Sequence, residues 1–179
     1  MGYSIKVADQ MFTLAKEMWK GETQAAQWAN SALAANIGYL GIPTSIFTKG
    51  EITPFDKKRI HSHTFIGSSM IKDVKVMDLD QEILMYHHEN IDGSGYPFGL
   101  KGDEIPLQSR IIAIADVFEA LTAKDRPHRK AKTLSEAFSI METMVRDNHI
   151  DKDLFEFFIA EKIYAAYAKR ELTPQQMNV

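Results

Sequence analysis

Residues 86 to 97 read Tyr86-His87-His88-Glu89-Asn90-Ile91-Asp92-Gly93-Ser94-Gly95-Tyr96-Pro97, so imidazole and carboxylate groups run directly into a turn. Gly93 and Gly95 can adopt positive φ, and Pro97 ends any helix and favours an extended Tyr96. Imidazole and carboxylate beside a rigid turn are what a metal or phosphate site needs. The stretch therefore predicts a candidate site, whose completeness depends on residues elsewhere in the chain.

The composition fits a single soluble domain. The 179 residues suffice to bury a sizeable core, and the net charge of -3 argues against binding to nucleic acid. Cysteine is absent, so any metal must be held by histidine, carboxylate or water. No apolar run approaches the length of a membrane span, and the first residues lack a signal-peptide pattern. We therefore expect a cytoplasmic protein that does not enter the membrane.

Hydrophobic periodicity predicts an all-α fold. About seven helices are expected, over residues 4–19, 22–36, 54–70, 80–89, 107–123, 133–146 and 152–170. Their starts carry capping signals, namely Thr53 followed by Pro54, then Asp80, and Thr133 with Glu136. A long Gly/Pro-rich loop covers residues 90–106, and such loops often have a function. We expect a single domain over residues 1–171 and a flexible tail over residues 172–179.

Four side chains on these helices are candidate metal ligands: His63, His87, His88 and Asp116. Asp116 interrupts an almost wholly apolar helix, so it either binds a cation or is a buried carboxylate paired with a neighbouring helix end or arginine. Each histidine alone is more simply a core or surface residue. Together the four offer ligands from three helices, a set suited to iron, manganese or zinc. The remaining histidines are not expected to be ligands: His61, which should face solvent, His128 and His149.

A basic cluster follows the helix that carries Asp116. It consists of Arg126, Arg129 and Lys130. Arginine can chelate an oxyanion, so the cluster suits a phosphate ligand. The simpler interpretation is a solvated loop.

The spaced motif resembles the signature of the HD-GYP family. The resemblance rests on His87-His88-Glu89, on residues 92–97 and on residues 110–116, with shorter matches at 38–43, 63–67, 99–100, 105–106 and 126–129. It implies an HD-domain-like helical bundle and a metal-dependent phosphodiesterase that hydrolyses cyclic di-GMP. It also implies that His63, His87, His88 and Asp116 bind metal.

The chain departs from the family at the His-Asp pair that gives the family its name. The same register reads Ala35-Asn36-Ile37-Gly38-Tyr39, so alanine replaces the histidine, asparagine the bridging aspartate and tyrosine a lysine. Tyr3 stands where the first helix of the family brings a histidine. A bridging aspartate neutralises two cations and sets their separation, whereas Asn36 carries no charge and Ala35 no ligand atom. We therefore expect one divalent ion at most, and no two-metal site.

Three functional interpretations follow from this comparison. The one adopted is a degenerate HD-GYP domain that binds cyclic di-GMP or a related phosphoester without efficient hydrolysis, and no residue is assigned as catalytic. The expected ligand contacts are Tyr96, Arg126, Arg129 and Lys130. The loop would engage a protein partner, such as a diguanylate cyclase domain, through Asp92, Gly93, Gly95, Tyr96 and Pro97. The alternatives are a slow phosphodiesterase with a reduced metal site and a packing module whose histidines are relics. A homodimer is left open.

Overall fold

The computed structural model describes residues 3–18, 21–74, 78–124 and 130–177, and its regular structure over these ranges is entirely helical. The main bundle comprises α1 (Tyr3–Glu17), α2 (Gly21–Ala34), α7 (Leu107–Thr122), α8 (Leu134–Arg146), α9 (Lys152–Ala160) and α10 (Tyr164–Glu171). The other elements are the 3₁₀ helices η1 (Ile37–Gly41) and η2 (Gly102–Glu104) and the helices α3 (Ser45–Thr48), α4 (Pro54–His61), α5 (His63–Ile71) and α6 (Gln81–Tyr86).

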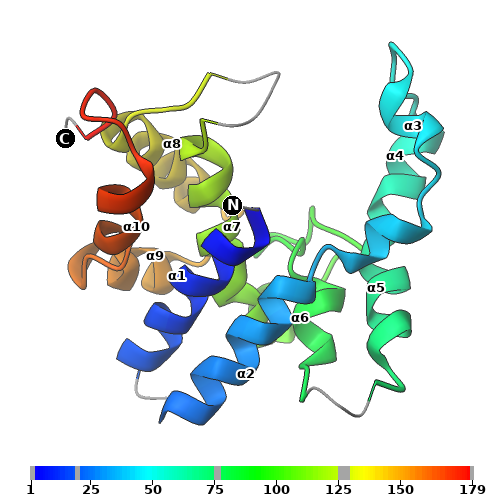
Figure 1. The fold of residues 1–179 in the computed structure, drawn as a ribbon, viewed down its shortest axis with the longest axis horizontal. Helices are drawn as coiled ribbons and strands as arrows, with labels where there is room; N and C mark the ends of the chain where they lie inside the picture. The colour runs from blue at the N-terminus through cyan, green and yellow to red at the C-terminus, as the bar shows by residue number, and fades with distance from the viewer. Residues whose placement is uncertain (1–2, 19–20, 75–77, 125–129, 178–179) are drawn as a thin grey trace.

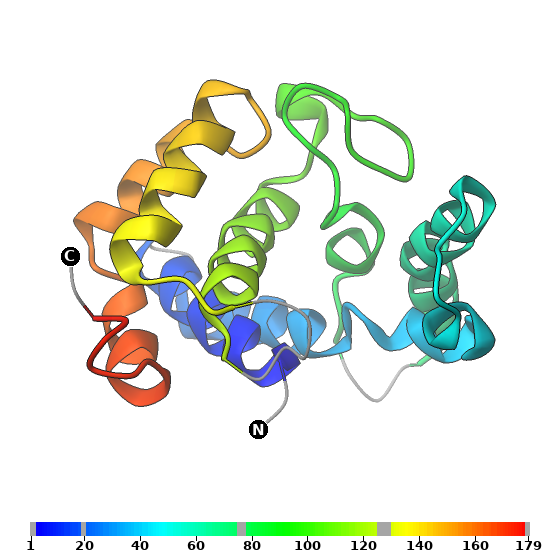
Figure 2. The same ribbon diagram turned by 90° about the horizontal axis from the view of Figure 1, so that it is seen from above.

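Helix α7 forms the centre of the core, as Figures 1 and 2 show. It packs against α1, α6, α8 and α9, and half of its residues are buried. Ile111, Ile114 and Phe118 are fully buried on it. The Phe118 ring contacts Phe158 on α9 and Tyr167 on α10 edge-on, at centroid distances of 5.3 and 5.5 Å. This apolar centre fixes α7 as the base on which the site is built.

Helices α3 and α4 stand away from the bundle, and α5 links them to η1 and α6 (Figures 1 and 2). The backbones of η1 and α5 meet at two glycines. A Cβ placed on Gly38 would lie 1.8 Å from the His63 carbonyl oxygen and 2.6 Å from the Gly67 nitrogen. Only glycine allows this approach, and the approach fixes η1 against the start of α5.

The predicted helix starts are confirmed. The Thr53 hydroxyl accepts from the Asp56 amide in a capping box, with Pro54 at the first helical position of α4. A second capping box joins Thr133 to Glu136 at α8. At α6 the Asp80 carboxylate accepts from the Glu82 amide. These local signals were sufficient to place the helix starts.

Two of the seven predicted helices are wrong as single helices, because each is divided in the structure. The predicted helix over 54–70 is α4 and α5, which meet at Ser62. The predicted helix over 152–170 is α9 and α10. Lys162 has a φ of 53°, and the Ile163 amide donates to the Phe158 carbonyl, so α9 ends in a Schellman motif. With the short α3, the described residues contain ten α-helices and two 3₁₀ helices.

The carboxyl-terminal segment contacts the bundle as far as Gln176. The Gln176 side chain donates to the carbonyls of Thr122 and Lys132, at 2.9 and 3.0 Å. The Gln176 backbone carbonyl accepts from the Leu134 amide at 2.8 Å. One buried amide side chain thus ties the segment to the ends of α7 and α8.

Candidate functional site

Three histidines from two elements form a compact cluster. His63 begins α5, and His87 and His88 directly follow α6. One ring nitrogen of each lies within 4.8 Å of the others, and His63 Nε2 is 3.5 Å from His87 Nε2. His63 and His87 are buried, and His88 is partly exposed. The structure therefore brings together three of the four predicted metal ligands.

Backbone carbonyls fix the orientation of the two buried imidazoles. His63 Nδ1 lies 2.8 Å from the Ile60 carbonyl, and His87 Nδ1 lies 3.0 Å from that of Ile83. A carbonyl only accepts, so each Nδ1 must carry the hydrogen and each Nε2 a lone pair. The two Nε2 lone pairs face each other with no proton between them. This is how a metal-binding histidine is anchored, and the arrangement suits a cation.

The environment keeps the three imidazoles neutral. Burial, together with the neighbouring His63, lowers the pKa of His87 to about 4. Burial likewise lowers the pKa of His88 to about 2 and is the main cause of the lowered pKa of His63. Histidine binds metal only in its neutral form. The cluster can therefore receive a cation at neutral pH without first losing protons.

Asp116 lies beside the cluster rather than within it. Its side chain comes from the middle of α7 and lines a cavity of about 330 Å³ together with His87 and His88. Its carboxylate oxygens are not among the mutually close ligand atoms of the three histidines. Asp116 thus contributes negative charge to the wall of the cavity that contains the cluster.

Aromatic rings cover the cluster. Tyr39 of η1 stacks on His63 with a distance of 4.1 Å between the ring centroids, and the ring centroids of Tyr96 and His88 are 4.8 Å apart. His61 stacks on Tyr96 at 3.7 Å with an angle of 3° between the rings, and it lines the cavity. The expectation that His61 faces solvent therefore holds only in part, because its side chain is partly exposed but stacks on Tyr96. That expectation assumed one straight helix through Ser62, whereas the break there reorients α4 relative to α5.

Glu89 holds the long loop in place, a role that the sequence did not reveal. Its buried carboxylate accepts from the backbone amides of Phe98, Gly99 and Leu100, at 2.7, 3.2 and 3.0 Å. The Tyr96 amide donates to the His88 carbonyl at 3.1 Å. The loop is thereby folded back onto the turn that carries the histidines. Only the position of Glu89 beside His88 could have indicated this, since its partners lie about ten residues later.

Two glycines of residues 86–97, Gly93 and Gly95, are required for different reasons. Gly93 has a φ of 84°, as expected. Gly95 is required by a close approach instead, because a Cβ there would lie 2.3 Å from the Asn90 nitrogen.

The Asp92 carboxylate accepts from the Ser94 amide at 2.8 Å and lies 3.7 Å from His149 Nε2. The Tyr96–Pro97 peptide bond is cis.

The predicted phosphate-binding cluster is only partly described. Arg126, Arg129 and His128 lie outside the described residues, as does the side chain of Tyr3. Lys130 is exposed. At the two positions of the family's His-Asp pair, Ala35 is buried in the hydrophobic core and Asn36 directly precedes η1.

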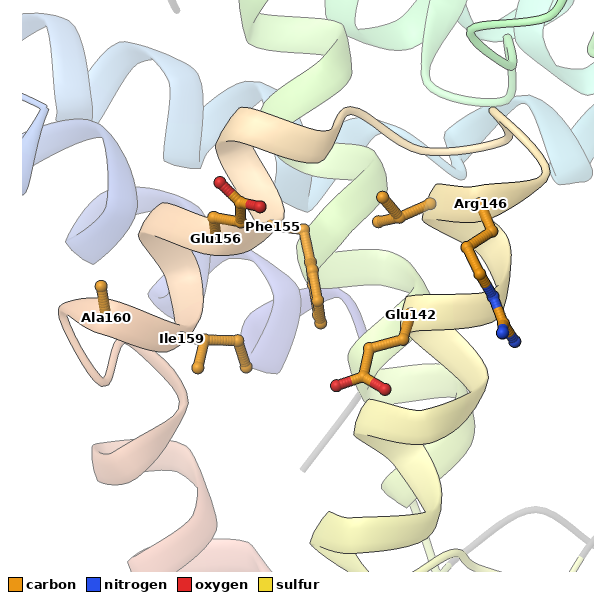
Figure 3. Close-up of a pocket in the computed structure, with 7 residues that line it drawn as sticks. Glu142, Arg146, Phe155, Glu156, Ile159 and Ala160 are labelled. Atoms are coloured by element: carbon orange, nitrogen blue, oxygen red, sulfur yellow. The ribbon is translucent and has the colours of Figure 1, made fainter.

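A second cavity, of about 510 Å³, lies between α8 and α9 (Figure 3). It is lined by Glu142, Val145, Arg146, Phe155, Glu156, Ile159 and Ala160. Its lining combines apolar side chains with three charged ones and includes no histidine. Although this cavity is larger, its residues offer no metal-binding or catalytic constellation. The histidine cavity is therefore the candidate site.

Comparison with known proteins settles the family. The HD domain matches residues 3–154. The chain belongs to the HD domain family. It is 35% identical over 161 residues to a cyclic di-GMP phosphodiesterase of Thermotoga maritima, a match that covers 88% of this chain and 44% of the relative. It is 38% identical over 159 residues to the 3′3′-cGAMP-specific phosphodiesterase 1 of Vibrio cholerae, covering 88% of this chain and 36% of the relative. These relatives confirm the HD-GYP resemblance.

Solved structures show the same fold. An HDG"Y"P protein from Bdellovibrio bacteriovorus matches with a TM-score of 0.66 at 17% identity, covering 86% of this chain and 49% of the other. The HD domain of the phosphodiesterase PgpH of L. monocytogenes, in complex with cyclic-di-AMP, matches with a TM-score of 0.65 at 16% identity, covering 93% and 89%. The all-α, HD-domain-like fold predicted from the sequence is thus confirmed.

The chain spans less than half the length of the curated relatives compared here. Over the residues that the structure describes, no helix combines the length and apolar character needed to cross a bilayer.

Proposed function

We propose that this chain is a degenerate HD-GYP domain that binds a cyclic dinucleotide, cyclic di-GMP first among them, without hydrolysing it efficiently. The observation that carries the proposal is the incomplete set of metal ligands. Three neutral imidazoles converge in the structure, while Ala35 and Asn36 stand at the sequence positions where the family has its His-Asp pair. The names of the relatives, which include phosphodiesterases for cyclic di-GMP and for 3′3′-cGAMP, support a cyclic dinucleotide as the ligand class.

The cluster fits one divalent metal ion. His63 and His87 would donate their facing Nε2 lone pairs and His88 a third nitrogen, while Asp116 would lower the net positive charge of the loaded site. Three nitrogen ligands and a nearby carboxylate suit iron, manganese or zinc. Such an ion, when bound, would draw a phosphate oxygen of the ligand toward the cluster and polarise it.

Efficient hydrolysis needs more than this cluster. In a two-metal phosphodiesterase a bridging carboxylate holds the ions at a fixed separation, so that both can act on the reacting oxygens. Asn36 offers one neutral carbonyl oxygen, and buried Ala35 offers none. The residues present therefore favour capture of the ligand over cleavage.

The remaining ligand and partner contacts are part of the same proposal. Tyr96, Arg126, Arg129 and Lys130 would contact the dinucleotide. The loop over residues 92–97 would present a preformed surface to a protein such as a diguanylate cyclase domain, because Glu89 already fixes its path. A rigid loop loses little conformational freedom on binding.

The second candidate is a slow phosphodiesterase with a single metal ion. This candidate is favoured by two groups that line the same cavity, namely the neutral, partly exposed His88 and the Asp116 carboxylate. Either group could move a proton during attack on phosphorus.

Calorimetric titration of the purified chain with cyclic di-GMP, combined with metal analysis, tests the proposal. We expect about one metal ion or fewer per chain and saturable binding with the dinucleotide recovered intact. His87→Ala should abolish metal binding, since it removes a fixed Nε2 donor. Two metal ions per chain with chelator-sensitive turnover would contradict the proposal.

A further inference from the structure

Helix α4 carries two side chains near the cavity, His61 and Lys57, that the HD-GYP signature does not include. His61 lies at the end of α4, lines the cavity and stacks on Tyr96. Tyr96 in turn contacts the ring of His88. A series of rings therefore leads from the histidine cluster outward to His61. His61 is partly exposed, and Tyr96 stacks on one face of its ring.

Lys57 lies on the same side of α4 as His61. The two residues are four positions apart, which places their side chains next to each other on one face of a helix. Burial lowers the pKa of His61, and the positive charge of Lys57 is close enough to contribute to the lowering. Lys57 is exposed, so its ammonium group remains available to an anion.

The cavity itself provides no such charge. Among its described lining residues there is no lysine or arginine, and Tyr39 occupies the position at which the family has a lysine. A cyclic dinucleotide carries two phosphates and two purine bases. It therefore requires a cation and a flat apolar surface close to the cluster, and α4 offers both.

Resting on the function proposed above, we infer that His61 and Lys57 form a nucleotide subsite on α4. One purine base stacks on the face of the His61 ring opposite Tyr96 and extends the series formed by His88 and Tyr96. The adjoining phosphate pairs with the Lys57 ammonium group. Nucleobases commonly stack on histidine and tyrosine rings, and phosphate pairs readily with lysine.

Helix α4 also provides a matched control. Arg59 is only two residues from both Lys57 and His61, which directs it to the opposite side of the helix. Its guanidinium lies over the Phe55 ring, 6.0 Å from the ring centroid. Arg59→Gln removes the same charge as Lys57→Gln, from the same helix, but away from the cavity.

The test is calorimetric titration of the whole chain and its variants with cyclic di-GMP at several salt concentrations. We expect His61→Ala to weaken binding roughly tenfold and His61→Phe, which keeps a flat ring, to restore most of the affinity. Lys57→Gln should weaken binding about fivefold and reduce its dependence on salt, because one phosphate contact is removed. Arg59→Gln should leave affinity and salt dependence unchanged.

A spectroscopic readout separates base stacking from mere packing of Tyr96. A cyclic dinucleotide that carries 2-aminopurine loses fluorescence when this base stacks on an aromatic ring. Binding should quench it in the wild type and in His61→Phe but much less in His61→Ala. If the wild type binds and the His61 and Lys57 variants match it in affinity and quenching, the subsite is wrong while the proposed function stands. If the wild type does not bind, both are overturned.

Discussion

Two walls that differ in the family side chains they keep flank the histidine cluster. One wall, made by the start of α5 and by the residues after α6, keeps three imidazoles, their backbone anchors and the fixed loop. The other wall is made by η1, where Tyr39 stacks on His63, and by the residues before it; it keeps the fold but carries Ala35, Asn36 and Tyr39 in place of the family's histidine, aspartate and lysine. The comparison teaches that the scaffold depends on glycine contacts and apolar packing. The metal chemistry depends on a few side chains that the scaffold does not need.

The contact between the two walls is where the largest effect on stability is expected. Gly38→Ala would push a methyl group into the His63 carbonyl and the Gly67 nitrogen, which are backbone atoms that cannot move aside. We expect a loss of about 3–5 kcal/mol in the free energy of unfolding, measured by denaturant titration. Gly50→Ala is the control, because a Cβ there has no neighbour within 4 Å. Equal stability of the two variants would show that the walls do not meet as described.

The loop should respond to a smaller change in the retained wall. Glu89→Gln replaces the carboxylate that accepts hydrogen bonds from three backbone amides. We expect the free energy of unfolding to fall by about 2–3 kcal/mol and hydrogen exchange to become faster at Phe98, Gly99 and Leu100. Glu104→Gln is the matched control, because exposed Glu104 accepts only from the Lys101 amide in its own turn. Unchanged exchange in Glu89→Gln would mean that other contacts hold the loop.

Acid should destabilise the metal-free protein through the retained histidines. The pKa of His87 is about 4 in the folded state against an ordinary value of 6.5, so the unfolded state binds more protons between these limits. Stability is therefore complete above pH 6.5 and falls as the pH drops toward 4. Between pH 7.5 and pH 5, His87 alone should account for a loss of about 2 kcal/mol. His87→Gln should have a flatter pH dependence in chelator-treated samples, and an unchanged slope would place the acid sensitivity elsewhere.

The sequence predicted the helical class, the helix starts and three converging histidines, because these depend on local capping, periodicity and a spaced motif. It did not predict the breaks at Ser62 and Lys162, since no glycine or proline marks either position. The first break had a consequence for the site, because it hid the position of His61 beside Tyr96. The role of Glu89 depends on backbone amides brought back by the loop, and a pattern of side chains cannot show those.

The most direct test of the central claim is a single-turnover assay. The chain, in excess and supplied with manganese or iron, is incubated with labelled cyclic di-GMP, and the bound nucleotide is then separated and identified. Our account predicts a bound nucleotide that remains cyclic, because Ala35 and Asn36 leave the second half of the metal site without its histidine and its bridging carboxylate. Rapid conversion of the bound nucleotide to linear pGpG or to GMP, abolished by chelator, would contradict it.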